Sequence, residues 1–214
     1  AILEILEPML TGPPSFTDSA QFSNPQSFHY MTLDRLSRSD QVIDNLLSPT
    51  DDVQNNRLLL ERYVMVYLYY AWGGPRWSNQ FNFLSPTKRV CNWNDGTTSG
   101  DGVWCGNGGV VEEIKLGNNK LTGPLDPILY HLDLRFIWLF ENIIHGSISS
   151  YIGNLDRLVG FEMDDNLLVG TIPTEMGNLS ALKYLYLYTT KIGGTIPTEL
   201  GRCTKLVGLD IEDS

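Results

Sequence analysis

The sequence predicts an α/β repeat solenoid with helices at its N-terminal end, and two observations lead to this fold class. The first is an aliphatic pattern, L-x-x-L-x-L-x-x-N-x-L-x-G-x-I, that returns throughout the second half of the chain. Its copies begin at Val111, Leu134, Leu158, Leu182 and Leu206, so the repeat is 23 or 24 residues long. A fixed period of this length is typical of stacked repeats that bury their apolar faces against each other. The second observation is a helical spacing of apolar residues before the repeats.

An irregular arm and a first helix are predicted at the start of the chain. The arm covers residues 1–22, which are rich in Pro, Gly and Ser after a short apolar start. Asn24 followed by Pro25 is typical of a helix start, and apolar residues of the next segment fall roughly on one face. We therefore expect a helix over residues 26–38.

A longer helix is predicted over residues 58–72, which are rich in bulky apolar side chains. Residues 48–52 supply cap and acidic first-turn residues, and Gly73 with the following Gly and Pro ends the helix. The side chains expected to pack on the first repeat are Leu59, Tyr63, Val66, Tyr67 and Tyr70. The aromatic residues here are interpreted as the core of an N-terminal cap rather than a cofactor site. The residues expected to extend this core are Trp77, Phe81, Phe83 and Leu84.

Each repeat is expected to contain a short parallel strand from which two apolar side chains point inward. These pairs are Ile114/Leu116, Ile137/Leu139, Phe161/Met163 and Leu185/Leu187. Asn119, Asn142 and Asn166 follow the strands, where carboxamides that donate and accept can satisfy backbone groups as a ladder. Thr190 and Ser214 occupy the same slot with shorter hydroxyls, so weaker cohesion is expected there. Because Ser214 falls in mid-repeat, we also expect further repeats beyond it.

The net charge of -10 is concentrated in the repeats, since residues 1–90 carry seven basic and nine acidic side chains and residues 91–214 carry eight and sixteen. An acidic surface disfavours nucleic acid as a partner, because nucleic-acid binding depends on Lys and Arg. A basic peptide, a cation or a neutral glycan fits the charge better. The alternative is that the acidity serves only solubility.

The second halves of the repeats read LTGPL, IHGSI, LVGTIP and IGGTIP. They resemble the G-x-I-P element of the plant-type leucine-rich repeat family, although the Pro is present only as Pro173 and Pro197. The string CNWNDGTTSGDGVWC is similar to the cap signature C-x-W…G-V-x-C that precedes such repeats. The string RYVMVYLYYAWGGPRWSNQFNFLS resembles the longer cap of secreted or membrane-tethered repeat proteins of diatoms and related algae. Together these motifs cover about residues 57–214.

The resemblance implies a leucine-rich repeat right-handed superhelix with a parallel β-sheet on its concave face. It also divides the chain into an N-terminal arm over residues 1–22, a helical N-terminal cap over residues 23–109, and leucine-rich repeats over residues 110–214. Members of the family bind peptides, proteins or polysaccharides. The resemblance is therefore specific for the fold and broad for the ligand.

The cap resemblance implies a disulfide between Cys91 and Cys105, which enclose thirteen residues. A disulfide implies an oxidising compartment, and hence secretion or the extracellular face of a membrane. The alternative is zinc, which needs four ligands where the sequence offers two cysteines without a nearby His. Cys203 falls in an inward position and is expected to be a buried free thiol. The sequon that begins at Asn178 predicts a glycosylation site on the convex side.

Catalytic motifs are missing from the sequence, which contains no G-x-S-x-G, Walker loop or H-E-x-x-H. The histidines His29, His131 and His145 lie far apart in register. The acidic residues around 162–165 and 210–213 are interpreted as a solvated face, because no loop of calcium-binding spacing surrounds them. We expect no enzyme, no cofactor and no metal site.

The outward strand positions predict a binding surface. The first column reads Lys115, Trp138, Glu162, Tyr186, Asp210; the second Gly117, Phe140, Asp164, Tyr188, Glu212; the third Glu113, Phe136, Gly160, Tyr184, Gly208. Two aromatic rows, Phe136/Trp138/Phe140 and Tyr184/Tyr186/Tyr188, therefore flank an acidic row, Glu162 and Asp164, with a dip at Gly160. Exposed aromatic surface usually marks a binding site, and rings beside carboxylates suit an Arg or Lys side chain or a sugar face. The alternatives are that aromatic residues merely favour strands, or that this face serves self-association.

These observations favour a non-catalytic extracellular recognition module that binds a protein, peptide or polysaccharide through the aromatic and acidic columns. One alternative is a scaffold subunit docked permanently in a larger cell-surface assembly. Another is an inhibitor of a secreted hydrolase. The longest apolar stretch is too short and too charged to span a bilayer, so no transmembrane segment is expected in this chain, while tethering of a longer parent protein stays open.

Overall fold

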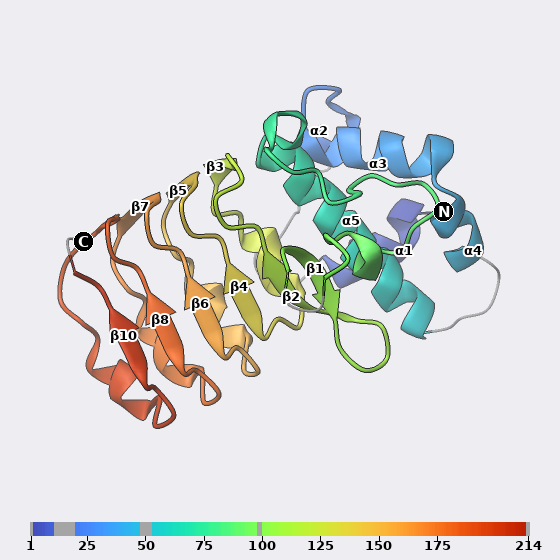
Figure 1. Ribbon diagram of the computed structural model, residues 1–214. Coiled ribbons are helices and arrows are strands. Elements are labelled where there is room, and N and C mark those ends of the chain that lie inside the picture. Colours follow the sequence, from blue (N-terminus) through green and yellow to red (C-terminus); the bar gives the residue numbers. More distant parts are fainter. Residues whose placement is uncertain (1, 11–19, 48–52, 98–99, 213–214) are drawn as a thin grey trace.

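Helices gather at the N-terminal end of the computed structural model, and strands follow one another toward the C-terminal end (Figure 1). The structure describes residues 2–10, 20–47, 53–97 and 100–212. The α-helices within these ranges are α1 (Ile2–Met9), α2 (Ala20–Ser23), α3 (Phe28–Ser39), α4 (Gln41–Leu46) and α5 (Val53–Ala71). Short 3-10 helices η1 (Gly74–Arg76) and η2 (Val90–Asn92) lie between α5 and the first strand.

The start of the chain is more helical than the sequence predicted. The arm expected to be irregular contains α1 and α2, and Leu6 and Leu10 are buried in the core. This burial supports a helix that is short and contains Pro8. The division of the chain into arm, cap and repeats stays a prediction.

Helix α3 begins at Phe28, two residues after the predicted start at residue 26. Ser27 caps the helix, and its Oγ accepts a hydrogen bond of 3.1 Å from the backbone N–H of Tyr30. Asn24 Oδ1 accepts instead from Gln26 N at 3.0 Å, in a turn that precedes the helix. An Asn side chain bonded two residues ahead stabilises a turn and delays the helix start.

The long helix α5 begins at Val53, five residues before the predicted start, and ends at Ala71, one residue before the predicted end. Gly73 follows it with φ of 71°, in the left-handed region that glycine adopts without strain. The cap predicted within residues 48–52 lies outside the described residues. Trp77, Phe81 and Phe83 are buried beside α5 as predicted, and Leu84 packs against the same core.

The strands form a larger and a smaller sheet. The larger sheet has the order β1 (Gly102–Cys105), β2 (Val111–Lys115), β4 (Phe136–Trp138), β6 (Gly160–Glu162), β8 (Tyr184–Tyr186) and β10 (Gly208–Asp210). The pairing of β1 with β2 is antiparallel, and the later pairs are parallel. The smaller sheet has the order β3 (Thr122–Pro124), β5 (Ile143–Gly146), β7 (Leu167–Gly170) and β9 (Lys191–Ile192).

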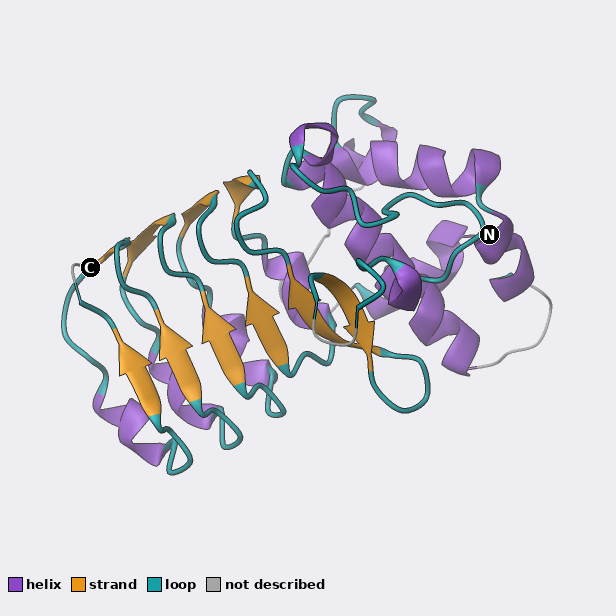
Figure 2. Cartoon of the chain, in the orientation of Figure 1, coloured by secondary structure: helices purple, strands orange, loops and turns teal. Residues whose placement is uncertain are grey.

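Short 3-10 helices complete the repeats behind the larger sheet (Figure 2). They are η3 (Pro127–His131), η4 (Ser150–Asn154), η5 (Thr174–Asn178) and η6 (Thr198–Arg202). The apolar pairs predicted to point inward from β2, β4, β6 and β8 are buried between the strands and these helices. Apolar burial between stacked repeats is therefore what holds this part of the chain together.

The asparagine ladder links consecutive repeats as predicted. Asn142 Nδ2 donates to Leu116 O at 2.9 Å in the preceding repeat, and its Oδ1 accepts from Asn119 N and Leu121 N. Asn166 makes the equivalent bonds to Leu139 O and Ile144 N.

Both ends of the ladder differ from its middle. Asn119 bonds the backbone of Asn79, so the ladder starts in the segment that follows α5. Thr190 Oγ1 bonds Leu187 O and Ile192 N, both within its own repeat. The hydroxyl at Thr190 therefore does not extend to the preceding repeat as the Asn side chains do, and Ser214 lies outside the described residues.

Helix α5 and the residue that follows it contact the end of the first repeat. Tyr67 Oη donates to Asp126 Oδ2 at 2.8 Å, and Trp72 Nε1 donates to Pro124 O at 2.9 Å. Tyr70, also expected at this contact, lies instead beside Asp34 and Arg35 of α3. Because α5 is covered on several sides, apolar spacing alone did not identify which side meets the repeats.

A disulfide joins Cys91 and Cys105 and closes a loop whose ends are 14 residues apart in sequence. This confirms the pairing that the cap resemblance implied. Cys203 is a buried free thiol, also as predicted, and its Sγ donates to Met176 O at 3.3 Å.

A buried ion pair connects α4 with α5. Arg62 Nε lies 2.6 Å from Asp40 Oδ2, and the side chains of both residues are almost fully buried. Asp40 also caps α4 through the N–H groups of Val42 and Ile43. The other guanidinium nitrogens of Arg62 donate to the carbonyls of Ser85 and Lys88. This arginine therefore links two helices and the segment that leads to the disulfide loop.

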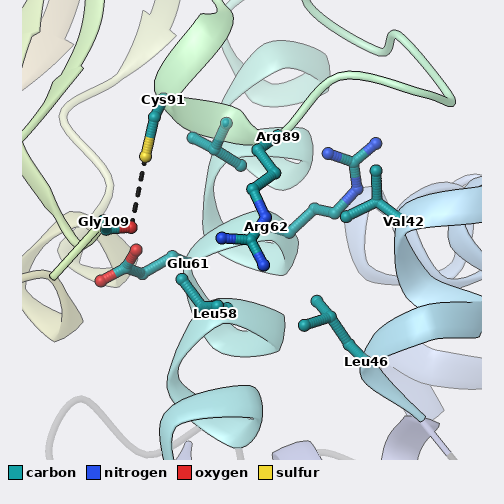
Figure 3. A pocket seen from close by; sticks show the side chains of 9 residues that line it. Val42, Leu46, Leu58, Glu61, Arg62, Arg89, Cys91 and Gly109 are labelled. Carbon is teal, nitrogen blue, oxygen red and sulfur yellow. Dashed lines mark hydrogen bonds between the residues drawn. The ribbon is translucent and has the colours of Figure 1, made fainter. Parts of the chain in front are cut away.

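The residue before Arg62 faces another element. Glu61 accepts a hydrogen bond of 3.0 Å from Arg57 Nε and another of 3.0 Å from Val111 N, at the start of β2. Figure 3 shows the Glu61 side chain pointing toward Gly109 and Cys91, beside a small cavity that Arg62 and Leu46 also line. Adjacent charged residues of α5 thus tie it to the first repeat and to α4.

Acid is expected to destabilise the helical part through His29. This side chain is buried among Phe22, Tyr63 and Tyr67, with Nδ1 2.5 Å from Tyr63 Oη. Burial lowers the pKa of His29 from 6.5 to about 4. Because the folded-state pKa lies below the unfolded value, the stabilisation is complete above pH 6.5 and is lost as the pH falls toward 4. The loss attributable to His29 is at most about 3 kcal/mol.

Urea unfolding at pH 7 and at pH 4.5 measures this effect in the wild type and in His29→Gln. The wild type is expected to lose more stability than the variant between the two pH values. Buried carboxylates with raised pKa values change stability in the opposite direction, but they are common to both proteins and cancel in the difference. An equal pH dependence in the two proteins would rule out His29 as the group responsible.

Candidate recognition surface

The solvent side of the larger sheet carries the columns that the repeat period predicted. Trp138 pairs with Glu162, and Glu162 pairs with Tyr186, so ring, carboxylate and ring stand on adjacent strands. Lys115 precedes Trp138 and Asp210 follows Tyr186 in the same register. Paired strands lie about 4.8 Å apart, so these side chains are neighbours. A role in binding stays a prediction for the residues of these rows: Phe136, Trp138, Phe140, Glu162, Asp164, Tyr184, Tyr186 and Tyr188.

Aromatic rings lie over glycines of neighbouring strands, and the dip predicted at Gly160 is therefore filled. A Cβ atom on Gly160 would lie 3.0 Å from Phe136 Cδ1 and 3.3 Å from Trp138 Nε1. A Cβ atom on Gly208 would lie 3.0 Å from Tyr184 Cδ1. Where a strand has no side chain, a ring from the adjacent strand can cover its backbone and bury apolar area.

Two further rings lean away from the third repeat. Phe140 lies over Gly117, where a Cβ atom would come 2.5 Å from Phe140 Cζ. Tyr186 leans the other way, and its Oη would lie 2.5 Å from a Cβ on Gly208. The side of Glu162 that faces Tyr186 is consequently left uncovered by that ring.

The two carboxylates of the acidic row differ in environment. Asp164 is only 5% exposed and accepts a hydrogen bond from the Tyr188 hydroxyl. Its interpretation as part of a solvated face was therefore wrong, because the ring of the next repeat covers it. Glu162 is half-buried, and burial raises the pKa of Glu162 to about 6. Among the described residues Glu162 has no ion pair or side-chain hydrogen bond.

Lys115 contributes to this surface in a way that the sequence reasoning missed. Its Nζ lies 4.4 Å from the centroid of the Trp138 ring and 2.6 Å from Glu113 Oε2. An ammonium group against an aromatic face and a carboxylate is a favourable cation–π arrangement. The column order placed Lys115 beside Trp138, but only the side-chain directions show that the ammonium lies over the ring.

Other kinds of site are not apparent in the described ranges. No group of three or more His, Cys, Asp or Glu residues that could hold a metal occurs within residues 2–10, 20–47, 53–97 and 100–212. Within the same ranges no helix is long and apolar enough to cross a membrane. Asn178 is exposed at the end of η5, behind the larger sheet, and its glycosylation stays a prediction.

Solved structures similar to this chain include ectodomains of plant proteins. The BIR3–SERK2 complex from Arabidopsis thaliana matches with 28% identity and a TM-score of 0.51, over 60% of this chain and 66% of that chain. The BIR2 ectodomain from Arabidopsis thaliana matches with 21% identity and a TM-score of 0.52, over 69% and 78% of the two chains. The complex of PEPR1 with AtPEP1 matches with 24% identity and a TM-score of 0.58, over 68% of this chain and 20% of that chain. No family model and no curated protein sequence matches the chain.

The repeat period and these similarities support a plant-type leucine-rich repeat protein, and the fold is that of leucine-rich repeat ectodomains. Matches below 25% identity bear on the fold alone. The chain spans 16%, 18% and 20% of the length of three longer chains that it matches. The resemblance of the N-terminal segment to algal caps stays a prediction.

Proposed function

We propose that this chain is an extracellular recognition module that binds a protein or peptide through the solvent side of the larger sheet and has no catalytic role. The observation that carries the proposal is the third repeat, where a half-buried carboxylate without a partner in the described residues stands between two aromatic rows. A parallel sheet is a rigid support that holds such side chains at fixed spacing. The rings offer apolar area, and the carboxylate offers specificity for a polar group.

A protein or peptide partner is favoured over a polysaccharide. One of the similar structures is a complex of two proteins, BIR3 and SERK2. The first column carries charges of both signs, from Lys115, Glu162 and Asp210. This arrangement suits the mixed charges of a protein surface. A permanent scaffold role and inhibition of a secreted hydrolase would use the same surface and differ in the partner.

The cap and the compartment belong to the same proposal. Helices α1 to α5 and the segment that follows α5 would act as an N-terminal cap, since the helices cover one end of the repeats and Asn79 supplies the first step of the asparagine ladder. The disulfide supports an oxidising compartment, as expected of a secreted or cell-surface protein.

The double variant Trp138→Ala/Tyr186→Ala is expected to reduce capture of partners at least about tenfold, since aromatic anchors dominate binding energy. Tagged wild-type chain and variant are incubated with secreted proteins and peptides of the source organism, and captured species are quantified by mass spectrometry. The matched control is Ile143→Ala/Val169→Ala, which shortens exposed side chains of the smaller sheet. Equal capture by the wild type and the Trp138→Ala/Tyr186→Ala variant, or loss only in the control, would contradict the proposal.

A further inference from the structure

We propose that the space over Glu162, between the strands that carry Trp138 and Tyr186, is a binding site for a basic side chain of the ligand. The ligand group would be a guanidinium or an ammonium, with guanidinium favoured because it is planar, stacks on rings and pairs with a carboxylate through two hydrogen bonds. This inference rests on the proposed function and names the chemistry that the surface recognises.

The first support is a cation that the surface already binds. Lys115 Nζ lies 4.4 Å from the Trp138 ring centroid and 2.6 Å from Glu113 Oε2, and only 13% of its side chain is exposed. An ammonium group of the chain itself thus contacts a ring and a carboxylate from adjacent strands of this sheet. Lys115 reaches Trp138 from the preceding strand, whereas Glu162 lies on the following strand, β6.

The second support is that Glu162 repeats this arrangement without a cation. It pairs with Trp138 on one side and with Tyr186 on the other. Neighbouring carboxylates already have partners, because Glu113 is bonded to Lys115 and Asp164 to Tyr188. Asp210 Oδ1 accepts from Glu212 N at 3.2 Å. Within residues 100–212, Glu162 is thus the half-buried carboxylate of the first column that has no side-chain hydrogen bond or ion pair.

The third support is the direction of the rings. Tyr186 leans toward Gly208 and Phe140 toward Gly117, so neither ring covers the Glu162 carboxylate. Trp138 leans toward Gly160, which places its indole Nε1 over β6, two residues from Glu162. A planar cation above Glu162 would therefore pair with the carboxylate and contact the uncovered side of the Tyr186 ring.

Burial without a counter-charge has an energetic consequence for Glu162. Desolvation raises the pKa of this carboxyl to about 6, with Asp164 adding a smaller effect in the same direction. A bound cation favours the charged form and therefore lowers the pKa. The basic ligand and the proton compete for the same carboxylate, which gives a second readout that a purely structural glutamate would not show.

The test is an NMR titration of the intact chain with N-acetyl-arginine amide, N-acetyl-lysine amide and N-acetyl-citrulline amide. Citrulline has nearly the shape of arginine and no charge. The readouts are the indole N–H resonance of Trp138 and the side-chain carboxyl resonance of Glu162 as a function of pH. We expect saturable shifts with the two cationic amides, none with the citrulline amide, and a lower pKa of Glu162 in the presence of the arginine amide.

Glu162→Gln is expected to weaken binding of the arginine amide at least about tenfold, which corresponds to the loss of one charge-assisted contact. The matched control is Glu175→Gln, which removes the same charge from η5, behind the sheet. Equal binding of the arginine amide by Glu162→Gln and the wild type, or equal binding of the citrulline and arginine amides, would overturn the inference.

The outcome also separates the inference from the proposed function. If the cationic amides fail to bind while Trp138→Ala/Tyr186→Ala still reduces capture of partners, the proposed cation site is wrong and the proposed recognition surface is retained. If neither experiment shows an effect, both are wrong.

Discussion

Replacing Arg62 by Met is expected to lower the free energy of unfolding by about 3 to 5 kcal/mol. The substitution retains a long apolar side chain and removes the guanidinium that pairs with Asp40 at 2.6 Å. Asp40 then remains buried with an uncompensated charge, and the carbonyls of Ser85 and Lys88 lose their donors. Chemical denaturation followed by circular dichroism measures the difference.

The exposed ion pair Arg38–Asp34 is the matched control for Arg62. Its atoms are also 2.6 Å apart, but the side chains are 71% and 34% exposed. Arg38→Met is expected to cost less than about 1 kcal/mol, because water replaces the lost partner. Adding Asp40→Asn to Arg62→Met is expected to recover part of the loss, since the amide still caps α4 and carries no charge. Equal costs for Arg62→Met and Arg38→Met would contradict the structural role of the buried pair.

The second large effect is expected at Asn142, where replacement by Ala should cost about 3 to 5 kcal/mol. The carboxamide donates to Leu116 O, Leu139 O and Phe140 O and accepts from the N–H groups of Asn119 and Leu121. These groups are shielded by the neighbouring repeats, so water cannot fully replace the lost partners. The loss is measured by urea unfolding.

Thr190 offers the comparison at the same position of a later repeat. Its hydroxyl bonds Leu187 O at 2.7 Å and Ile192 N at 3.4 Å, within one repeat. Thr190→Ala is therefore expected to cost about 1 kcal/mol, close to the value of a single hydrogen bond. A cost at Thr190 as large as that at Asn142 would show that the ladder does not set the cohesion between repeats.

The repeat period predicted the stacked repeats, because each residue there is surrounded by the equivalent residues of adjacent repeats. The inward pairs such as Ile137 and Leu139, and the ladder residues Asn142 and Asn166, lie where the period places them. The helical part has no such repetition, and its prediction was weaker. Helix α1 was missed because tertiary burial of Leu6 supports it, and the start of α3 was misplaced because Asn24 stabilises a turn instead.

The columns of the candidate surface could be predicted from the sequence, whereas the directions of their side chains could not. Register alone places Trp138 beside Glu162. It does not reveal that Lys115 lies over the Trp138 ring, that Tyr188 covers Asp164, or that rings fill the gap at Gly160. Those features depend on rotamers, and a side chain adopts its rotamer according to the neighbours it finds after folding.

Photo-crosslinking tests the recognition surface directly. The substitutions are Tyr186→p-benzoylphenylalanine on the larger sheet and Leu167→p-benzoylphenylalanine on β7 of the smaller sheet, where Leu167 is also exposed. Each variant is irradiated with a partner that the wild type captures, and crosslinked products are mapped by mass spectrometry. Recognition through the larger sheet predicts crosslinks from position 186 and none from position 167. Crosslinks from position 167 alone would contradict it.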